Sequence, residues 1–177
     1  MSDREQYEKA IFYYNRKNYI LAVKEFEKIV NCTKDSEYKD KANLNLGKCY
    51  MLGDSVLKDS KKASEIFLNL SSKSSYVQTQ LHKDNDLQNY AKLGLAKCYE
   101  QDLNYKEAFR IYYELSNVLN SAKYELAHFY KEGSDGVTKN KEEAVKLYKD
   151  LTSNEEFKFG SIFDMMMNFL INTQRYT

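Results

Sequence analysis

The sequence predicts an all-α fold: a right-handed superhelical solenoid of four antiparallel helical hairpins, with a capping helix at the C-terminus. The first observation is a recurring string of nine residues, which reads ANLNLGKCY at 42–50, AKLGLAKCY at 91–99, AKYELAHFY at 122–130 and, more weakly, EQYEKAIFY at 5–13. The second observation is a string of eight residues that follows each copy, at 22–29, 63–70, 108–115 and 144–151. Four copies of a two-part unit are typical of a stacked repeat.

Each string has the pattern of an amphipathic helix. In the longer string, apolar and small residues recur at i, i+4, i+5 and i+8, which places them on one helical face. The central small residue lets a neighbouring helix approach, and a Tyr three positions later fills the same seam; the small residues are Ala10, Gly47, Ala96 and Ala127. In the shorter string, an Ala is followed by an aromatic residue and then by Leu or Ile. Small residues against large ones, twice per unit, predict an antiparallel hairpin with interdigitated packing.

This pattern resembles the tetratricopeptide repeat (TPR) and the related SEL-one-like repeat (SLR). The units at about 3–36 and 85–118 are similar to TPRs because their links, RKNY and DLNY, are short. The units at about 38–71 and 119–152 are similar to SLRs, with longer links in which Asp59 and Asn140 are predicted to cap the second helix. The resemblance implies one α-solenoid domain over residues 1–177 that acts in protein–protein interaction.

Two segments lie outside the predicted repeats. Residues 72–84 form an insertion that we interpret as a surface loop, with a short helix at 75–82 as the alternative. Residues 155–173 are predicted to form a helix with only a narrow polar stripe, which favours a role in capping the last exposed face of the array. Its excess apolar surface also makes it a second candidate surface for a partner, through Phe163, Met166, Met167 and Leu170.

Composition narrows the classes of function. The chain has 177 residues and a formal net charge of +1, so it has no global attraction for nucleic acid or for an acidic membrane. Only four of its 27 basic residues are arginine, which argues against a dedicated nucleic-acid reader. No apolar stretch is long enough to span a bilayer, and the three cysteines have no C-x-x-C spacing. We therefore expect a cytoplasmic protein without membrane insertion.

The sequence contains no recognisable catalytic or nucleotide-binding motif. His82 and His128 are its only histidines, so a metal site would have to recruit distant carboxylates or thiols. Cys49 and Cys98 lie beside the predicted hairpin seams, where we expect buried and inert thiols. We therefore expect no enzymatic activity, no metal and no cofactor.

The first helices of stacked hairpins line a concave groove. The residue after each central small residue, together with those three before and four after it, should point into that groove. The candidate groove residues are Tyr7, Ile11, Tyr14, Leu44, Lys48, Met51, Lys97, Tyr124, His128 and Lys131. An aromatic and aliphatic wall beside a line of positive charge suits a protein segment with apolar and acidic residues. The alternative is that the apolar members pack between first helices and the lysines are ordinary solvated charges.

One known variant of such a groove fits the sequence poorly. Asn45 matches one position of the TPR clamp that grips the C-terminal carboxylate of a chaperone. However, Tyr7 and Ile11 stand where the resemblance requires Lys and Asn in the first helix, so that clamp is disfavoured.

The sequence thus predicts a non-catalytic adaptor, scaffold or regulatory subunit that binds a protein through the concave groove. One alternative is a factor docked on a large ribonucleoprotein such as the ribosome, which the exposed lysines allow but the near-neutral charge disfavours. A less favoured alternative is an enzyme with an unrecognised site. The identity of the partner, the pathway and the oligomeric state are not specified by the residues.

Overall fold

A computed structural model of the chain describes residues 2–53, 57–72, 83–153 and 161–174. Within these ranges it contains nine α-helices and no strand, although Ser134 and Val137 form an isolated bridge. The prediction of an all-α fold is confirmed. The predicted short helix at 75–82 and most of the predicted insertion at 72–84 lie outside the described residues, as do residues 155–160.

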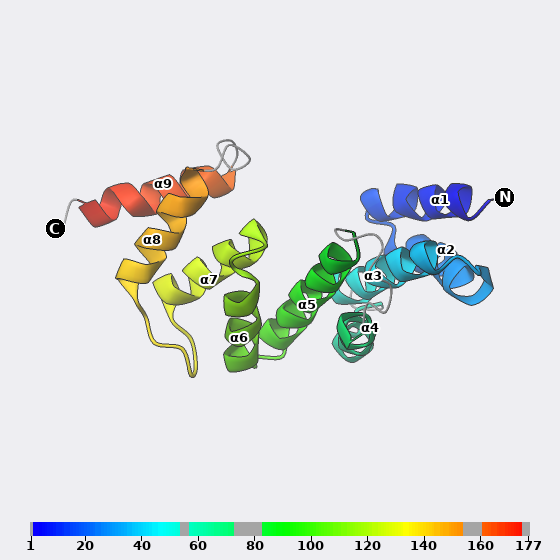
Figure 1. Cartoon of the computed structure of the whole chain (residues 1–177), viewed down its shortest axis with the longest axis horizontal. Coiled ribbons are helices and arrows are strands. Elements are labelled where there is room, and N and C mark those ends of the chain that lie inside the picture. The colour runs from blue at the N-terminus through cyan, green and yellow to red at the C-terminus, as the bar shows by residue number, and fades with distance from the viewer. Residues whose placement is uncertain (1, 54–56, 73–82, 154–160, 175–177) are drawn as a thin grey trace. The chain divides into compact units, whose positions relative to one another are not determined.

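The chain divides into two compact units, Met1–Leu103 and Asn104–Thr177. The division falls inside the predicted repeat at 85–118. The helices of the first unit are α1 (Asp3–Asn15), α2 (Tyr19–Cys32), α3 (Ser36–Leu52), α4 (Ser60–Ser72) and α5 (Lys83–Gln101) (Figure 1). Those of the second unit are α6 (Tyr105–Leu115), α7 (Asn120–Glu132), α8 (Lys141–Thr152) and α9 (Ser161–Gln174).

Within each unit, successive helices pack against one another. In the first unit α3 also contacts both α1 and α5, so the three first helices of its hairpins lie side by side. In the second unit α7 packs between α6 and α8, and α9 packs on α8. The first helices of the first unit therefore share a face, as expected for stacked hairpins.

Several helices begin directly after a residue whose side chain caps the free backbone N–H groups of the first turn. Ser2 and Glu5 form a capping box at the start of α1, in which each side chain accepts a hydrogen bond from the backbone N–H of the other residue. The two predicted caps are confirmed: Asp59 accepts a hydrogen bond from the N–H of Lys62, and Asn140 accepts one from the N–H of Glu143. These bonds satisfy donors that have no partner inside the helix.

The repeated small and large positions form the core. The alanines that begin the shorter strings are fully buried, and so are nearly all of the aromatic, Leu and Ile residues that follow them; the set is Ala22, Phe26, Ile29, Ala63, Phe67, Leu70, Ala108, Tyr112, Leu115, Ala144, Tyr148 and Leu151. The central small residues Ala10, Ala96 and Ala127 are also fully buried. The packing predicted from the two strings is therefore present in each unit.

Phe67 of α4 lies against two glycines on two different helices. A Cβ atom added to Gly47 of α3 would stand 2.7 Å from the Phe67 ring, and one added to Gly94 of α5 would stand 2.6 Å from it. Both distances are far below ordinary carbon–carbon contact, about 3.5–4.0 Å. Both glycines are therefore required by the close approach of α3 and α5 to this ring. The sequence analysis identified Gly47 at this seam but did not identify Gly94.

The two short hairpin turns share an unusual backbone conformation. Lys17, between α1 and α2, has φ of 58°, and Leu103, between α5 and α6, has φ of 61°. Each is followed by Asn-Tyr, so RKNY and DLNY form the same type of turn. A left-handed conformation costs a residue with a Cβ atom about 1–2 kcal/mol, so each turn is locally strained.

Candidate protein-binding surfaces

The candidate groove residues of the first unit lie on α1, α3 and α5. Tyr7 is held in place by its neighbours: its ring centroid lies 6.0 Å from that of Phe26 and 5.8 Å from that of Tyr38. The Nδ2 of Asn45 donates a hydrogen bond of 2.8 Å to the Tyr7 hydroxyl and another of 3.0 Å to the carbonyl of Lys41. Both N–H donors of the Asn45 amide therefore form hydrogen bonds within the protein, and the bond to Tyr7 joins α3 to α1.

Ile11 and Tyr14 lie further along α1, one and two turns after Tyr7. Both side chains are half-buried, and the Tyr14 ring packs against Tyr19 with centroids 5.8 Å apart. Burial, with smaller contributions from Cys49 and Tyr19, raises the pKa of Tyr14.

Three predicted groove residues lie on α3, and two of them are in the core. Leu44 and Met51 are only 8% and 6% exposed, because α3 is packed between α1 and α5. They contribute to packing, and neither presents an open surface to a partner. Lys48 lies between them on the helix and is half-buried. On α5, Lys97 is half-buried as well.

Lys48 differs electrostatically from the other lysines of the first unit. Burial lowers the pKa of its amine, and the neighbouring Cys49 offsets this only in part. Among the residues that the structure describes, no carboxylate forms an ion pair with it and no acceptor forms a hydrogen bond with it. The amine therefore loses part of its hydration without gaining an opposite charge.

The remaining groove candidates lie on α7 in the second unit. The Tyr124 ring packs against Tyr148 of α8, with centroids 6.1 Å apart. The amine of Lys131 lies 5.6 Å from the Phe169 ring centroid on α9 and pairs with Glu132 at 2.7 Å. His128 is half-buried. Tyr124 and Lys131 therefore make contacts with the two helices that follow α7, and part of their surface is already occupied.

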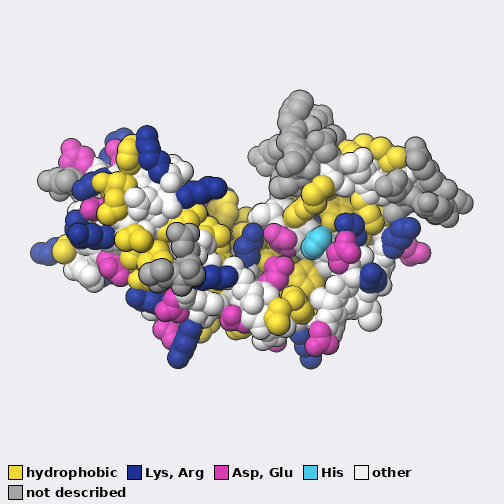
Figure 2. Space-filling model, turned by 180° about the vertical axis from the view of Figure 1, so that it is seen from behind, with side chains coloured by type: hydrophobic (Ala, Val, Ile, Leu, Met, Phe, Trp, Pro, Cys, Tyr) yellow, Lys and Arg dark blue, Asp and Glu magenta, His cyan; other side chains and the backbone are white. Residues whose placement is uncertain are grey.

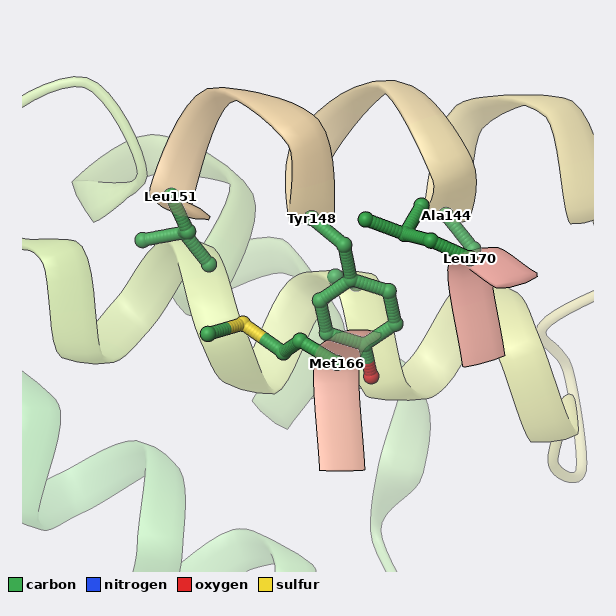
Figure 3. Close-up of a cluster of buried hydrophobic side chains, with 6 residues drawn as sticks. Ala144, Tyr148, Leu151, Met166 and Leu170 are labelled. Carbon is green, nitrogen blue, oxygen red and sulfur yellow. The ribbon is translucent and has the colours of Figure 1, made fainter. Parts of the chain in front are cut away.

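The C-terminal helix packs as a cap on the second unit. Met166 and Leu170 are 1% and 7% exposed and join a core cluster with Ala127, Ala144, Tyr148 and Leu151 (Figure 3). Met167 packs against this cluster and is half-buried, whereas the side chain of Phe163 lies outside the described residues. Met166 and Leu170 were predicted as part of a partner surface, but their side chains fill the core. On the same helix, Met165 and Ile171 remain exposed.

Two buried ionic and polar clusters were not anticipated from the sequence. Glu25 of α2 is buried, and its carboxylate accepts hydrogen bonds from Lys9 of α1 at 3.3 Å and from Lys28 at 2.9 Å. In the second cluster, the Tyr50 hydroxyl donates to Glu27 and accepts from Lys62, which links α2, α3 and α4. Each cluster joins helices through residues that are far apart in the sequence, so no short sequence motif indicates these contacts.

The described residues offer little for chemistry. Burial raises the pKa of both Cys49 and Cys98 to about 12, so these thiols stay protonated near neutral pH and are poor nucleophiles. Within the described ranges, no group of three or more His, Cys, Asp or Glu side chains is arranged to hold a metal ion. No helix in those ranges is both long and apolar enough to cross a membrane.

The fold and these surfaces define an all-α repeat protein built from helical hairpins. The Sel1 repeat profile matches residues 40–67 and 120–149, which correspond to the α3/α4 and α7/α8 hairpins. The two matched hairpins are those whose longer links resemble SLRs in the sequence. A search of curated protein sequences finds no significant match.

Solved structures share the fold at low sequence identity. One is a protective antigen present in uropathogenic Escherichia coli strains, which displays an SLR fold; it is 20% identical, with a TM-score of 0.57 over 89% of this chain. This chain spans only 32% of that protein's length. Another is a kinesin light chain of Podospora anserina with nearly identical TPR-like repeats, at 16% identity and a TM-score of 0.61 over 97% of this chain and 85% of that one. A single-residue variant of the same protein gives 15% identity and a TM-score of 0.60. These likenesses establish the SLR/TPR-like fold.

Proposed function

We propose that this protein is a non-catalytic adaptor or regulatory subunit that binds a protein partner through the face formed by its first helices. The observation that carries the proposal is the α1–α3 edge of the first unit. There Ile11 and Tyr14 of α1 are half-buried, and Lys48 of the neighbouring helix α3 has no anionic partner among the described residues. Helical-hairpin repeats commonly use such a face for partner segments, because its apolar side chains are held in place by a rigid scaffold.

The non-catalytic part of the proposal is supported by the state of the thiols. Burial and the raised pKa values keep Cys49 and Cys98 protonated near neutral pH, so neither thiol is suited to act as a nucleophile. Cys32, Cys49 and Cys98 are all free, which suits a reducing compartment, so we place the protein in the cytoplasm.

A ribonucleoprotein target is less well supported by the charge distribution. On the face shown in Figure 2, the Lys and Arg side chains of the described residues are interspersed with acidic and hydrophobic ones. Proteins that grip phosphates need clustered positive charge, and their binding weakens steeply as salt is raised.

The proposal is tested by affinity capture with the tagged full chain, at low and at high salt, followed by mass spectrometry. We expect a stoichiometric protein that survives high salt and is lost with the paired change Lys48→Glu and Lys97→Glu. The matched control is Lys24→Glu with Lys61→Glu, which reverses two exposed charges on the second helices α2 and α4. Circular dichroism should show that both paired variants remain helical.

The outcomes separate the possibilities. Loss of capture in the control pair but not in the first pair would move the interface to the second helices. Recovery of RNA-bearing particles that dissociate at high salt would overturn the proposal in favour of a factor docked on a ribonucleoprotein.

A further inference from the structure

Several other lysines of the first unit have partners within the protein. Lys9 and Lys28 share Glu25, Lys41 pairs with Glu37 at 2.6 Å, and Lys62 donates to the Tyr50 hydroxyl. Lys48 has no such partner among the described residues. A partly desolvated amine without an opposite charge destabilises the folded state, so its presence calls for a compensating contact from outside the chain.

The contacts between α1 and α3 show what surrounds this amine. The Asn45 amide of α3 donates to the Tyr7 hydroxyl of α1, and the two helices pack against each other. Ile11 lies one turn after Tyr7 and one turn before Tyr14, so it is level with Lys48, which lies between Asn45 and Cys49. A ligand that reaches the Lys48 amine is therefore within reach of Ile11 and, one turn further along α1, of Tyr14.

We infer that Lys48 binds the carboxylate of an Asp or Glu side chain in a partner segment whose adjoining apolar residue packs on Ile11 and Tyr14. This inference rests on the proposed protein-binding function and specifies the chemistry of the partner. A peptide carboxylate is favoured over a nucleic-acid phosphate because the lysine stands alone beside apolar side chains. The nearby arginines are engaged elsewhere: Arg4 pairs with Glu8, and Arg16 lies over the Phe12 ring.

The test uses a phage-displayed library of random 12-residue peptides selected on the full chain. We expect enrichment of peptides in which Asp or Glu adjoins an apolar residue. The affinities of one selected synthetic peptide, and of the same peptide with its acidic residue changed to the amide, are then measured by fluorescence anisotropy. Lys48→Met should weaken binding of the acidic peptide by about 10-fold to 100-fold, the range for a hydrogen bond to a charged group.

A double-mutant cycle gives the decisive comparison. Lys48→Met should have little effect on the amide peptide, because the contact is already absent from that pair. Lys24→Met, which removes an exposed lysine from α2, is the matched control and should leave both affinities unchanged. Because Lys48→Met also removes a partly desolvated charge, its melting temperature should equal or exceed that of the wild type.

Each contrary result has a distinct meaning. Selected peptides without acidic enrichment, or equal losses for the acidic and amide peptides, would overturn the Lys48 assignment and leave protein binding intact. Tight binding of a poly(U) oligonucleotide that is lost in Lys48→Met would assign the site to phosphate instead. A selection that yields no peptide at all would count against the proposed function itself.

Discussion

Replacing Gly47 with alanine should destabilise the protein, although alanine is normally the better residue inside a helix. The new Cβ atom would stand 2.7 Å from the Phe67 ring, about 1 Å closer than ordinary contact. The ring has little room to retreat, because it is fully buried and packs so near Gly94 that a Cβ atom there would meet it just as closely. Overpacking of this kind costs about 1–3 kcal/mol, whereas the gain in helix propensity is about 1 kcal/mol. The net expectation is a loss of up to about 2 kcal/mol.

Thermal and urea unfolding followed by circular dichroism measure this loss. For a chain of this size, each 1 kcal/mol lowers the melting temperature by about 2–4 °C. Phe67→Leu in the same chain provides room beside the new methyl group, so the double variant should lose less stability than the sum of the two single variants. An increase in stability for Gly47→Ala alone would refute the reasoning, because it would show that helix propensity outweighs the contact with Phe67.

Three further predictions concern other parts of the fold. Leu103→Gly should stabilise the chain by about 0.5–1 kcal/mol, since it relieves the left-handed backbone at an exposed residue; a lower melting temperature would contradict this. Met166→Ala should cost about 2–5 kcal/mol and loosen α9, measured as faster hydrogen exchange of its amides, whereas exposed Met165→Ala should have little effect on either quantity. Burial alone would raise the pKa of Glu25, but hydrogen bonds from Lys28 and Lys9 outweigh burial and lower that pKa. The ionised Glu25 carboxylate therefore stabilises the fold at neutral pH, and this stabilisation is lost as the pH falls through the lowered pKa. Glu25→Gln should therefore be less stable than the wild type at pH 7, with the difference shrinking in acid; an equal difference at pH 7 and pH 3 would contradict the assignment.

The all-α repeat fold could be predicted from the sequence because its packing repeats. Ala63, Phe67 and Leu70 occupy the same positions in their string as Ala144, Tyr148 and Leu151, and all six are buried. A pattern that recurs in four copies averages out local ambiguity, since each copy must bury the same face of the same kind of helix. The caps at Asp59 and Asn140 were predictable for a similar reason, because each is a short polar residue four positions before the Ala that begins a repeated string.

The contacts between copies were less predictable than those within a copy. Gly94 was not identified because the repeat assigns the seam position to Ala96, whereas the Phe67 ring reaches α5 half a turn earlier. The Glu25 ion pairs join α1 and α2 through long side chains, whose reach covers several helical positions. Such contacts depend on the exact offset between neighbouring helices, and the spacing of the strings does not specify that offset.

The unspecified offset between neighbouring helices also explains why some residues of the predicted groove are buried and others are accessible. A position in the repeat determines the direction in which a side chain points, but the neighbouring helices determine how far it is covered. Tyr7 and Leu44 occupy equivalent positions, yet Tyr7 is half-buried on α1, whereas Leu44 is buried because α3 has α1 on one side and α5 on the other. An apolar side chain on a flanked helix gains free energy by packing between its neighbours. The amine of Lys48, one turn after Leu44, gains nothing from such packing and is only partly covered. In the proposed contact with a partner, Lys48 is therefore the residue of α3 that takes part, and the half-buried Ile11 and Tyr14 of α1 supply the apolar part.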